Sequence, residues 1–187
     1  MLIQDNGAWK GDDVHVHHHF DSGLCESLKL FFTNNKAKSV CDLGCGLGVY
    51  VTELDKSAEF TCSGFDGNPD TPKLTNNKCK VLDLSVPTKL EEQYDWIMSL
   101  EVGEHLPMDF EDIYMNNLHI NNKYGIVLSW AVEGQGGLGH YNERNNDYIK
   151  DKIITLGYIN DIEAENYLRE ASSLFWFKNT IMVFRKC

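Results

Sequence analysis

Short apolar runs alternate along this chain with stretches whose apolar residues recur at helical spacing. Near the start, Phe20, Leu24, Leu28 and Phe31 fall on one face of a helix, which is predicted over about residues 21–33. Apolar runs predict strands at 39–43, 60–65, 79–82, 96–100, 125–131, 158–162 and 180–184. Helices are predicted between most of these strands. The alternation indicates an α/β fold, with a mostly parallel sheet covered by helices on both faces.

Other helical stretches have recognisable ends. Tyr114 and Leu118 lie at helical spacing after Asp109, a residue type that caps helix N-termini, so a helix is predicted to begin at that residue. Another stretch ends at Gly157, because glycine readily adopts the left-handed conformation of a C-terminal cap. A last helix is predicted over 163–174, ahead of the final strand.

The composition is that of a globular protein. Of 187 residues, 42% are hydrophobic and 24% are charged. No basic segment followed by an apolar run lies near the first residue, and no apolar run approaches the roughly 18 residues that span a bilayer. The six cysteines form no CxxC pair, which favours reduced thiols and a cytoplasmic location. We expect one domain over 1–187, with an N-terminal lid and helix segment at 1–37 and a core sheet at 38–187.

The charge balance narrows the choice of partners. Lysine and arginine total 17 against 28 aspartate and glutamate residues, for a net charge of −11. Such a surface disfavours a sequence-independent grip on nucleic-acid phosphates. A small-molecule partner is therefore expected, with no nucleic acid and no membrane. An acidic domain of this size can be a monomer or a homodimer.

The sequence DLGCGLG, at 42–48, lies where the first predicted strand of the sheet meets a helix. In open α/β sheets, ligands bind at the carboxyl ends of the strands, and glycines in the first turn let the backbone approach the ligand. The dinucleotide fingerprint GxGxxG needs its third glycine at position 49, where this chain has Val49. The turn therefore predicts a nucleotide-like ligand and disfavours a nicotinamide dinucleotide, although a nicotinamide-dependent oxidoreductase on the same sheet stays open as an alternative.

From about residue 39 to residue 131, the chain resembles the class I S-adenosylmethionine-dependent methyltransferases. Four motifs in order carry the resemblance: CDLGCGLG, GFDGNP, VLDLS and YDWIMSLEVGEHLP. The resemblance implies a seven-stranded Rossmann-like sheet. It also implies an enzyme that transfers the methyl group of S-adenosylmethionine and releases S-adenosylhomocysteine.

The same resemblance assigns residues to the cofactor. Gly44, Gly46 and Gly48 would line its methionine part, and Asp42 would hold its amino group. Asp66 would bind the two ribose hydroxyls, since a carboxylate can accept a bidentate pair of charge-assisted hydrogen bonds. The full expected set is Asp42, Gly44, Cys45, Gly46, Gly48, Asp66, Gly67, Asn68, Asp83, Leu84, Leu100 and Glu101. For Asp83 the alternative is a simple helix cap.

The end of the fourth strand supplies the catalytic candidates, which are Glu104, His105 and His140. His105 is the best candidate for a general base, because its ordinary pKa lies near working pH. The main prediction is metal-free transfer to an oxygen or nitrogen atom of a small molecule.

Two further alternatives stay open. Glu101, Glu104, His105 and His140 could instead hold a divalent cation. The ExxEH pattern resembles that of ubiquinone-pathway O-methyltransferases and of plant small-RNA 3′-terminal methyltransferases, and a metal-assisted enzyme would act on a quinone-like phenol or an RNA 3′ end. A non-catalytic S-adenosylmethionine-binding partner subunit is the other alternative.

Two loops are expected on the acceptor side. Loops at the carboxyl ends of strands carry substrate contacts on a rigid scaffold. The candidates in the loop after the fifth strand are Trp130, Glu133, His140, Tyr141, Asn142 and Arg144. The other loop holds the histidine cluster His15, His17, His18 and His19, which is read as an exposed polar loop, as a metal-binding segment, or as part of a lid over the cofactor. Trp9 and Gly11 would lie at the hinge of that lid.

Overall fold

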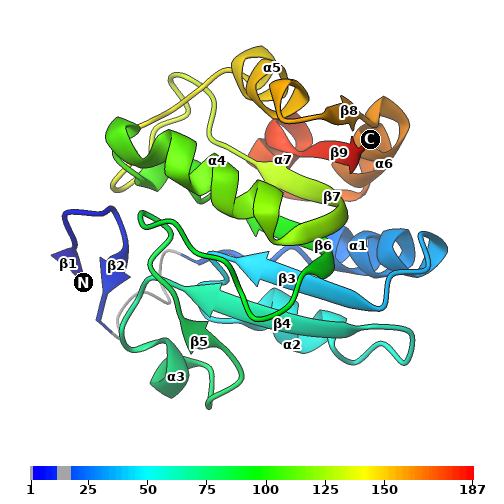
Figure 1. Cartoon of the computed structure of the whole chain (residues 1–187), viewed down its shortest axis with the longest axis horizontal. Coiled ribbons are helices and arrows are strands. Elements are labelled where there is room, and N and C mark those ends of the chain that lie inside the picture. The colour runs from blue at the N-terminus through cyan, green and yellow to red at the C-terminus, as the bar shows by residue number, and fades with distance from the viewer. Residues whose placement is uncertain (1, 12–17) are drawn as a thin grey trace.

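The computed structural model describes residues 2–11 and 18–187, which surround a seven-stranded sheet (Figure 1). In the order in which they lie in the sheet, the strands are β5 (Lys80–Val81), β4 (Thr61–Asp66), β3 (Ser39–Leu43), β6 (Tyr94–Leu100), β7 (Asn122–Ser129), β9 (Met182–Lys186) and β8 (Tyr158–Asn160). Neighbouring strands from β5 to β7 are parallel, whereas β9 is antiparallel to both β7 and β8. The predicted fold class, a mostly parallel seven-stranded sheet, is confirmed.

Helices cover the sheet on both faces. They are α1 (Ser22–Asn34), α2 (Val49–Leu54), α3 (Thr71–Leu74), α4 (Glu111–Ile120), α5 (Asn146–Thr155), α6 (Ile162–Ala171) and α7 (Phe175–Thr180). Successive residues of β6 point to opposite faces, so Trp96 packs with Leu28 of α1, whereas Ile97 packs with Leu118 of α4. This alternation divides the core into two apolar clusters, one on each side of the sheet. No helix of the described residues is both long and apolar enough to cross a membrane.

The chain near the C-terminus differs from the prediction. In place of one helix over 163–174, α6 ends at Ala171 and a separate short helix, α7, follows. The break has a long-range cause. One oxygen of the buried Asp21 carboxylate accepts hydrogen bonds from the backbone N–H groups of Ser173 (2.6 Å) and Leu174 (2.9 Å), which holds this segment extended. The other oxygen accepts from the N–H of Leu24 and so caps α1.

Three smaller corrections concern other ends of elements. Asp109 was expected to cap a helix, but it lies in a short 3₁₀ turn, and the N-cap position of α4 is Phe110, without a side-chain cap. The last strand is shifted toward the C-terminus, because Thr180 belongs to α7. An antiparallel hairpin of β1 (Leu2–Ile3) and β2 (Trp9–Lys10) was not predicted. The cap at Gly157, with a φ of 91°, is confirmed.

The loop after β7 is fixed to the start of α4 by the buried Glu111. Its carboxylate accepts hydrogen bonds from Asn142 (2.9 Å), Arg144 (3.0 Å) and Tyr148 (2.6 Å), and Lys152 lies 2.6 Å away. Burial acts to raise the pKa of Glu111, but the bonds from these four side chains outweigh it and lower the pKa to about 2. The loop after β7 is therefore held against α4 by hydrogen bonds and ion pairs to the Glu111 carboxylate.

Because the folded pKa of Glu111 is depressed, this network stabilises the fold above the ordinary pKa of 4.5 and is lost as the pH falls toward about 2. We expect Glu111→Gln to lower the free energy of unfolding by about 1–3 kcal/mol at neutral pH. The loss is expected to shrink as acid is added. Urea unfolding of Asp112→Asn, an exposed neighbour, provides the control. Equal losses in the two variants would contradict the role of Glu111.

Candidate active site

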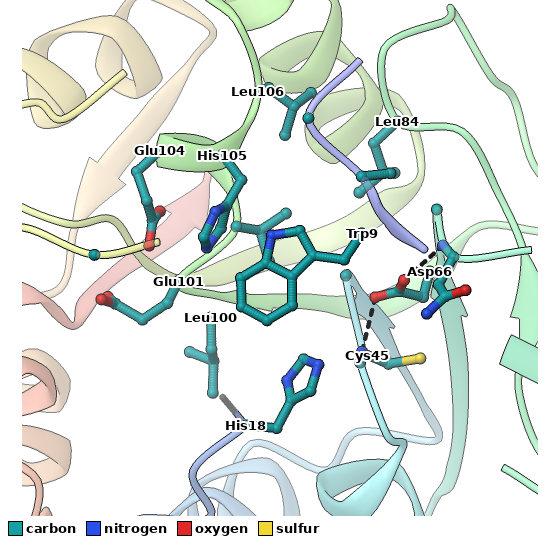
Figure 2. A pocket seen from close by; sticks show the side chains of 18 of the residues that line it. Trp9, His18, Cys45, Asp66, Leu84, Leu100, Glu101, Glu104, His105 and Leu106 are labelled. Atoms are coloured by element: carbon teal, nitrogen blue, oxygen red, sulfur yellow. Dashed lines mark hydrogen bonds between the residues drawn. The ribbon is translucent and has the colours of Figure 1, made fainter. Parts of the chain in front are cut away.

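A cavity of about 460 Å³ opens at the carboxyl ends of β3, β4 and β6 (Figure 2). Strand β3 pairs with β4 on one side and with β6 on the other, so the order of the strands reverses at this point. Turns that leave such neighbouring strands in opposite directions form a crevice, where ligands of open α/β sheets bind.

The glycine-rich turn forms the floor of the cavity. Gly44 and Gly46 have φ angles of 90° and 53°, a left-handed conformation in which other residues are strained. A Cβ atom on Gly44 would lie 2.4 Å from the Val102 side chain, so the close approach also requires glycine. The N–H of Gly46 donates to the carboxylate of Asp66 over 2.8 Å, which ties the ends of β3 and β4 together.

The predicted cofactor residues are brought together. All of them except Gly48 line the cavity. Gly48 instead begins α2, where a Cβ would lie 2.9 Å from the Cys79 sulfur. Asp42 is buried in the cavity wall, and burial, with smaller contributions from Cys79 and Asp66, raises its pKa well above the usual value.

Asp83 accepts hydrogen bonds from the backbone and the hydroxyl of Ser85. These bonds, with one from Asn6, outweigh the opposing effect of burial and lower the pKa of Asp83. The carboxylate is therefore ionised at neutral pH.

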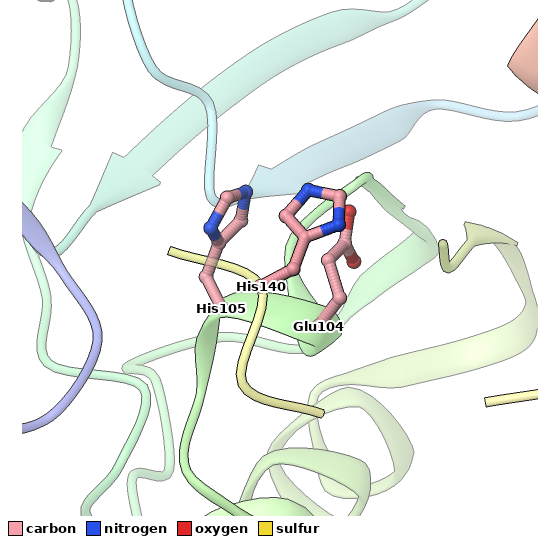
Figure 3. Close-up of side chains that lie close together, drawn as sticks. All are labelled: Glu104, His105 and His140. Carbon is pink, nitrogen blue, oxygen red and sulfur yellow. The ribbon is translucent and has the colours of Figure 1, made fainter. Parts of the chain in front are cut away.

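Glu104, His105 and His140 gather on one wall of the cavity (Figure 3). One potential ligand atom from each residue lies within 4.8 Å of the other two. Glu104 and His105 belong to a 3₁₀ turn at 103–105, whereas His140 comes from the loop after β7. That loop is held here by the backbone N–H groups of Tyr141 and Asn142, which donate to the carbonyl oxygen of Glu104 over 2.8 and 2.9 Å.

The Glu104 carboxylate is fully buried, and neither oxygen has a hydrogen-bond partner within the described residues. The backbone N–H groups of Glu104 and Ala131 lie nearby. Burial first, and then the neighbouring carboxylate of Glu101, raise the pKa of Glu104 well above its usual value. A buried carboxylate in this setting requires a proton or a cation.

Glu101 is held in place from three sides. Its carboxylate accepts hydrogen bonds from Gln135 (2.7 Å) and from Thr180 of α7 (3.0 Å), and its backbone N–H donates to Ser129. Burial raises its pKa. Its φ of 52° is unusual for a residue other than glycine, and such strain is found mostly at functional sites.

The two imidazoles are oriented by separate partners. His105 Nδ1 lies 3.1 Å from the carbonyl oxygen of Gly139, and His140 Nδ1 lies 2.9 Å from the Glu143 carboxylate. Burial, together with the charge of His140, lowers the pKa of His105 to about 4. His105 is therefore neutral at working pH, the state in which an imidazole accepts a proton or binds a metal ion.

The predicted acceptor residues are placed very differently from one another. His140 lines the cavity, whereas Trp130 is buried in the core and donates to the Asn142 carbonyl oxygen over 2.6 Å. Asn142 and Arg144 contact Glu111 instead of the cavity. Tyr141 is exposed beside a separate shallow depression, and Glu133 is exposed on the surface. No substrate role follows from these positions.

Sequence reasoning placed Trp9 only at a hinge, but its ring lies inside the cavity. It lies 5.1 Å from the ring of His105 and 5.4 Å from that of His18, and Figure 2 shows it between His105 and Asp66. The pair Asn6-Gly7 between β1 and β2 is a common hairpin turn and was a signal for this element. His18 and His19 line the cavity, whereas His15 and His17 lie outside the described residues.

Comparisons with known proteins agree with this geometry. The family described as "Methyltransferase domain" matches residues 16–120. No match was found among curated protein sequences.

Several solved structures share the fold. Magnesium protoporphyrin IX methyltransferase from Synechocystis PCC 6803, with bound SAH, has a TM-score of 0.66 at 17% identity, over 87% of this chain and 81% of that chain. The methyltransferase domain of bacterial CtHen1-C has a TM-score of 0.61 at 19% identity, over 87% and 96%. The glycopeptide N-methyltransferase MtfA, complexed with SAM, has a TM-score of 0.62 at 9% identity, over 89% and 95%.

The chain therefore belongs to the methyltransferase domain family. Its fold is that of the class I S-adenosylmethionine-dependent methyltransferases, so the predicted class of enzyme is confirmed.

The raised pKa of Glu104 generates a prediction about stability. A carboxyl group that holds its proton more tightly when folded stabilises the fold at low pH, and this contribution is lost as the pH rises through the raised pKa. In EDTA, we expect the Glu104→Gln variant to lose less stability than the parent as the pH rises above the ordinary carboxyl pKa of 4.5, since an amide does not titrate. Urea unfolding at a series of pH values measures the two slopes. Identical slopes would show that Glu104 carries no raised pKa.

Proposed function

We propose that this chain binds S-adenosylmethionine in the cavity and transfers its methyl group to a hydroxyl of a small-molecule acceptor, assisted by a divalent cation. The observation that carries the cation is the Glu104 carboxylate, buried without a partner beside two imidazoles and a second carboxylate. This observation favours the metal-assisted alternative over metal-free transfer with His105 as the general base.

The cofactor fits the residues on the β3 and β4 side of the cavity. Asp66 would accept the two ribose hydroxyls, and the open backbone at Gly44 and Gly46 would lie along the methionine part. Asp42, in the wall beneath the turn, would meet the amino group. Asp83 and Leu84 would border the adenine. S-Adenosylmethionine supplies a methyl group on a positively charged sulfur, and the acidic lining of this cavity suits that charge.

The donor set fits a divalent cation. Glu104 offers an oxygen ligand, and His105 and His140 offer nitrogen ligands, whereas Glu101 is not part of this close set and its carboxylate accepts from Gln135 and Thr180. Mixed carboxylate and imidazole sets suit ions such as Mn²⁺, Fe²⁺ and Zn²⁺. A bound cation would neutralise the buried carboxylates and polarise the hydroxyl of the acceptor.

The protein's own residues then do the positioning. Methyl transfer is an in-line displacement, so holding the oxygen, the methyl carbon and the sulfur in line supplies much of the catalysis. The backbone of Glu104 fixes the loop that carries His140, and Trp9 covers the cavity next to His105. The neutral His105 ring leaves a nitrogen able to bind a ligand or a proton.

The cofactor assignment is tested by Asp66→Ala. Loss of the hydrogen bonds to the ribose is expected to weaken S-adenosylmethionine binding by roughly 10- to 100-fold, since hydrogen bonds to charged groups contribute about 1.5–3 kcal/mol each. Isothermal titration calorimetry measures the affinity. Asp109→Ala, an acidic residue outside the cavity, is the matched control. Unchanged affinity in Asp66→Ala would remove the cofactor from this position.

The cation is tested by binding and by activity together. We expect Mn²⁺ to raise the melting temperature of the parent protein and to have little effect on Glu104→Gln, whereas Glu133→Gln, a surface glutamate of the nearby loop, should respond as the parent does. Release of S-adenosylhomocysteine is expected to stop in EDTA and to return with Mn²⁺.

Two other outcomes would replace the proposal. Full activity in EDTA, with none in His105→Ala, would establish His105 as a general base. Tight binding of S-adenosylmethionine, without product release for any member of an acceptor library, would favour a non-catalytic partner subunit.

A further inference from the structure

Several aromatic side chains border the cavity. The sequence assigned none of them a role in the site. We name this group the aromatic wall, and it consists of Phe20, Tyr50, Phe175 and Trp176, joined by His19. Phe20 packs on Tyr50 with ring centroids 5.0 Å apart, and Phe175 packs on Trp176 at the same separation. His19 precedes Phe20 in the chain, and its ring lies 5.4 Å from that of Trp176.

The wall is built beside the proposed cation ligands. Trp176 and Thr180 lie one turn apart on α7, and the Thr180 hydroxyl donates to the Glu101 carboxylate over 3.0 Å. Asp21 fixes the other end, since its carboxylate holds the chain at Ser173 just before α7. The backbone N–H of Asp21 also donates to the Tyr50 hydroxyl oxygen over 3.1 Å. Asp21 therefore positions both the Phe20–Tyr50 pair and the Phe175–Trp176 pair.

The wall is left exposed where apolar side chains are normally buried. Phe175 is 64% exposed and Phe20 is 40% exposed, although both lie at the cavity. Exposed aromatic surface at the edge of a concave site commonly marks ligand binding. Aromatic faces stack on planar ligands with little selectivity for the ring system.

The charge of the cavity limits what can stack there. No lysine or arginine lines the cavity among the described residues, and residues 12–17 contain neither type in their sequence. Five carboxyl groups, those of Asp42, Asp66, Asp83, Glu101 and Glu104, line it instead. A phosphate-bearing acceptor, such as a nucleotide or an RNA end, would meet acidic side chains with no lysine or arginine among the described lining residues to pair with its phosphate.

We propose that the acceptor is an uncharged planar aromatic compound with a ring hydroxyl, and that its ring stacks on Phe175 and Trp176. This proposal rests on the proposed function. The hydroxyl then reaches Glu101 and its neighbours, one helical turn away along α7. In the transfer, the bond from oxygen to the methyl carbon forms as the sulfur–methyl bond breaks. The hydroxyl proton leaves to solvent, and the sulfur keeps the bonding electron pair as a neutral thioether.

The experiment uses the full chain with Mn²⁺ and S-adenosylmethionine, and follows release of S-adenosylhomocysteine. Catechol is the planar probe, and 1,2-cyclohexanediol is the non-planar probe with a similar diol. We expect methylation of catechol alone. Trp176→Leu is expected to raise the KM for catechol roughly 10-fold with little change in kcat, and Trp176→Phe should restore most of the affinity.

Controls separate binding from folding. The affinity for S-adenosylmethionine should be unchanged in Trp176→Leu, which shows that this variant is folded. Tyr167→Leu, which removes an exposed aromatic of α6 outside the cavity, should behave as the parent does. In the parent with bound S-adenosylhomocysteine, catechol should quench tryptophan fluorescence, and Trp176→Phe should lose most of that quenching.

Three results would overturn the aromatic acceptor and leave the proposed function standing. These are methylation of the cyclohexane diol as readily as of catechol, methylation of an RNA 3′ end in place of catechol, and an unchanged KM for catechol in Trp176→Leu. Failure of cofactor or Mn²⁺ binding in the parent protein would instead overturn the proposed function, and this proposal with it.

Discussion

A carboxylate removed from water without a hydrogen-bond partner is the constraint on which this structure depends most. Burying an ionised carboxyl group is costly unless it gains a proton, a counter-charge or several hydrogen bonds. Glu104 has none of the usual compensations among the described side chains, and the half-buried carboxylate of Glu101 lies beside it. Two oriented imidazoles complete the surroundings. A proton or, as we propose, a bound cation compensates this arrangement.

The other sides of the cavity surround the cluster of Glu104, His105 and His140. The glycine-rich turn and Asp66 form the side on which the cofactor is proposed to bind, and the aromatic wall forms a second side. Glu101 connects the two regions, because it ends β6 and accepts a hydrogen bond from α7. The strain at its backbone is consistent with a position fixed by function.

Features set by local sequence could be predicted, and features set by distant contacts could not. The glycine turn, the strands and the cofactor residues follow each other within short segments, so their order alone indicated the fold and the cavity floor. The division between α6 and α7 depends on Asp21, about 150 positions earlier, which no local pattern reveals. Phe175 and Trp176 therefore lie outside every predicted element, between the predicted helix over 163–174 and the last strand.

In the loop after β7, distant contacts also decide where the predicted site residues lie. Its polar and aromatic residues suggested an acceptor site, but Glu111 draws Asn142 and Arg144 inward, and Trp130 is buried behind them. Of these candidates, His140 reaches the cavity because the backbone of Glu104 holds the loop.

The most direct measurement is anomalous diffraction from crystals grown with Mn²⁺ and S-adenosylhomocysteine. We expect an anomalous peak between the side chains of Glu104, His105 and His140, with Glu101 beside it. We also expect cofactor density along Gly44 and Gly46, with the ribose at Asp66. Ordered cofactor density with no anomalous peak at these side chains, at saturating Mn²⁺, would contradict the cation that the account requires.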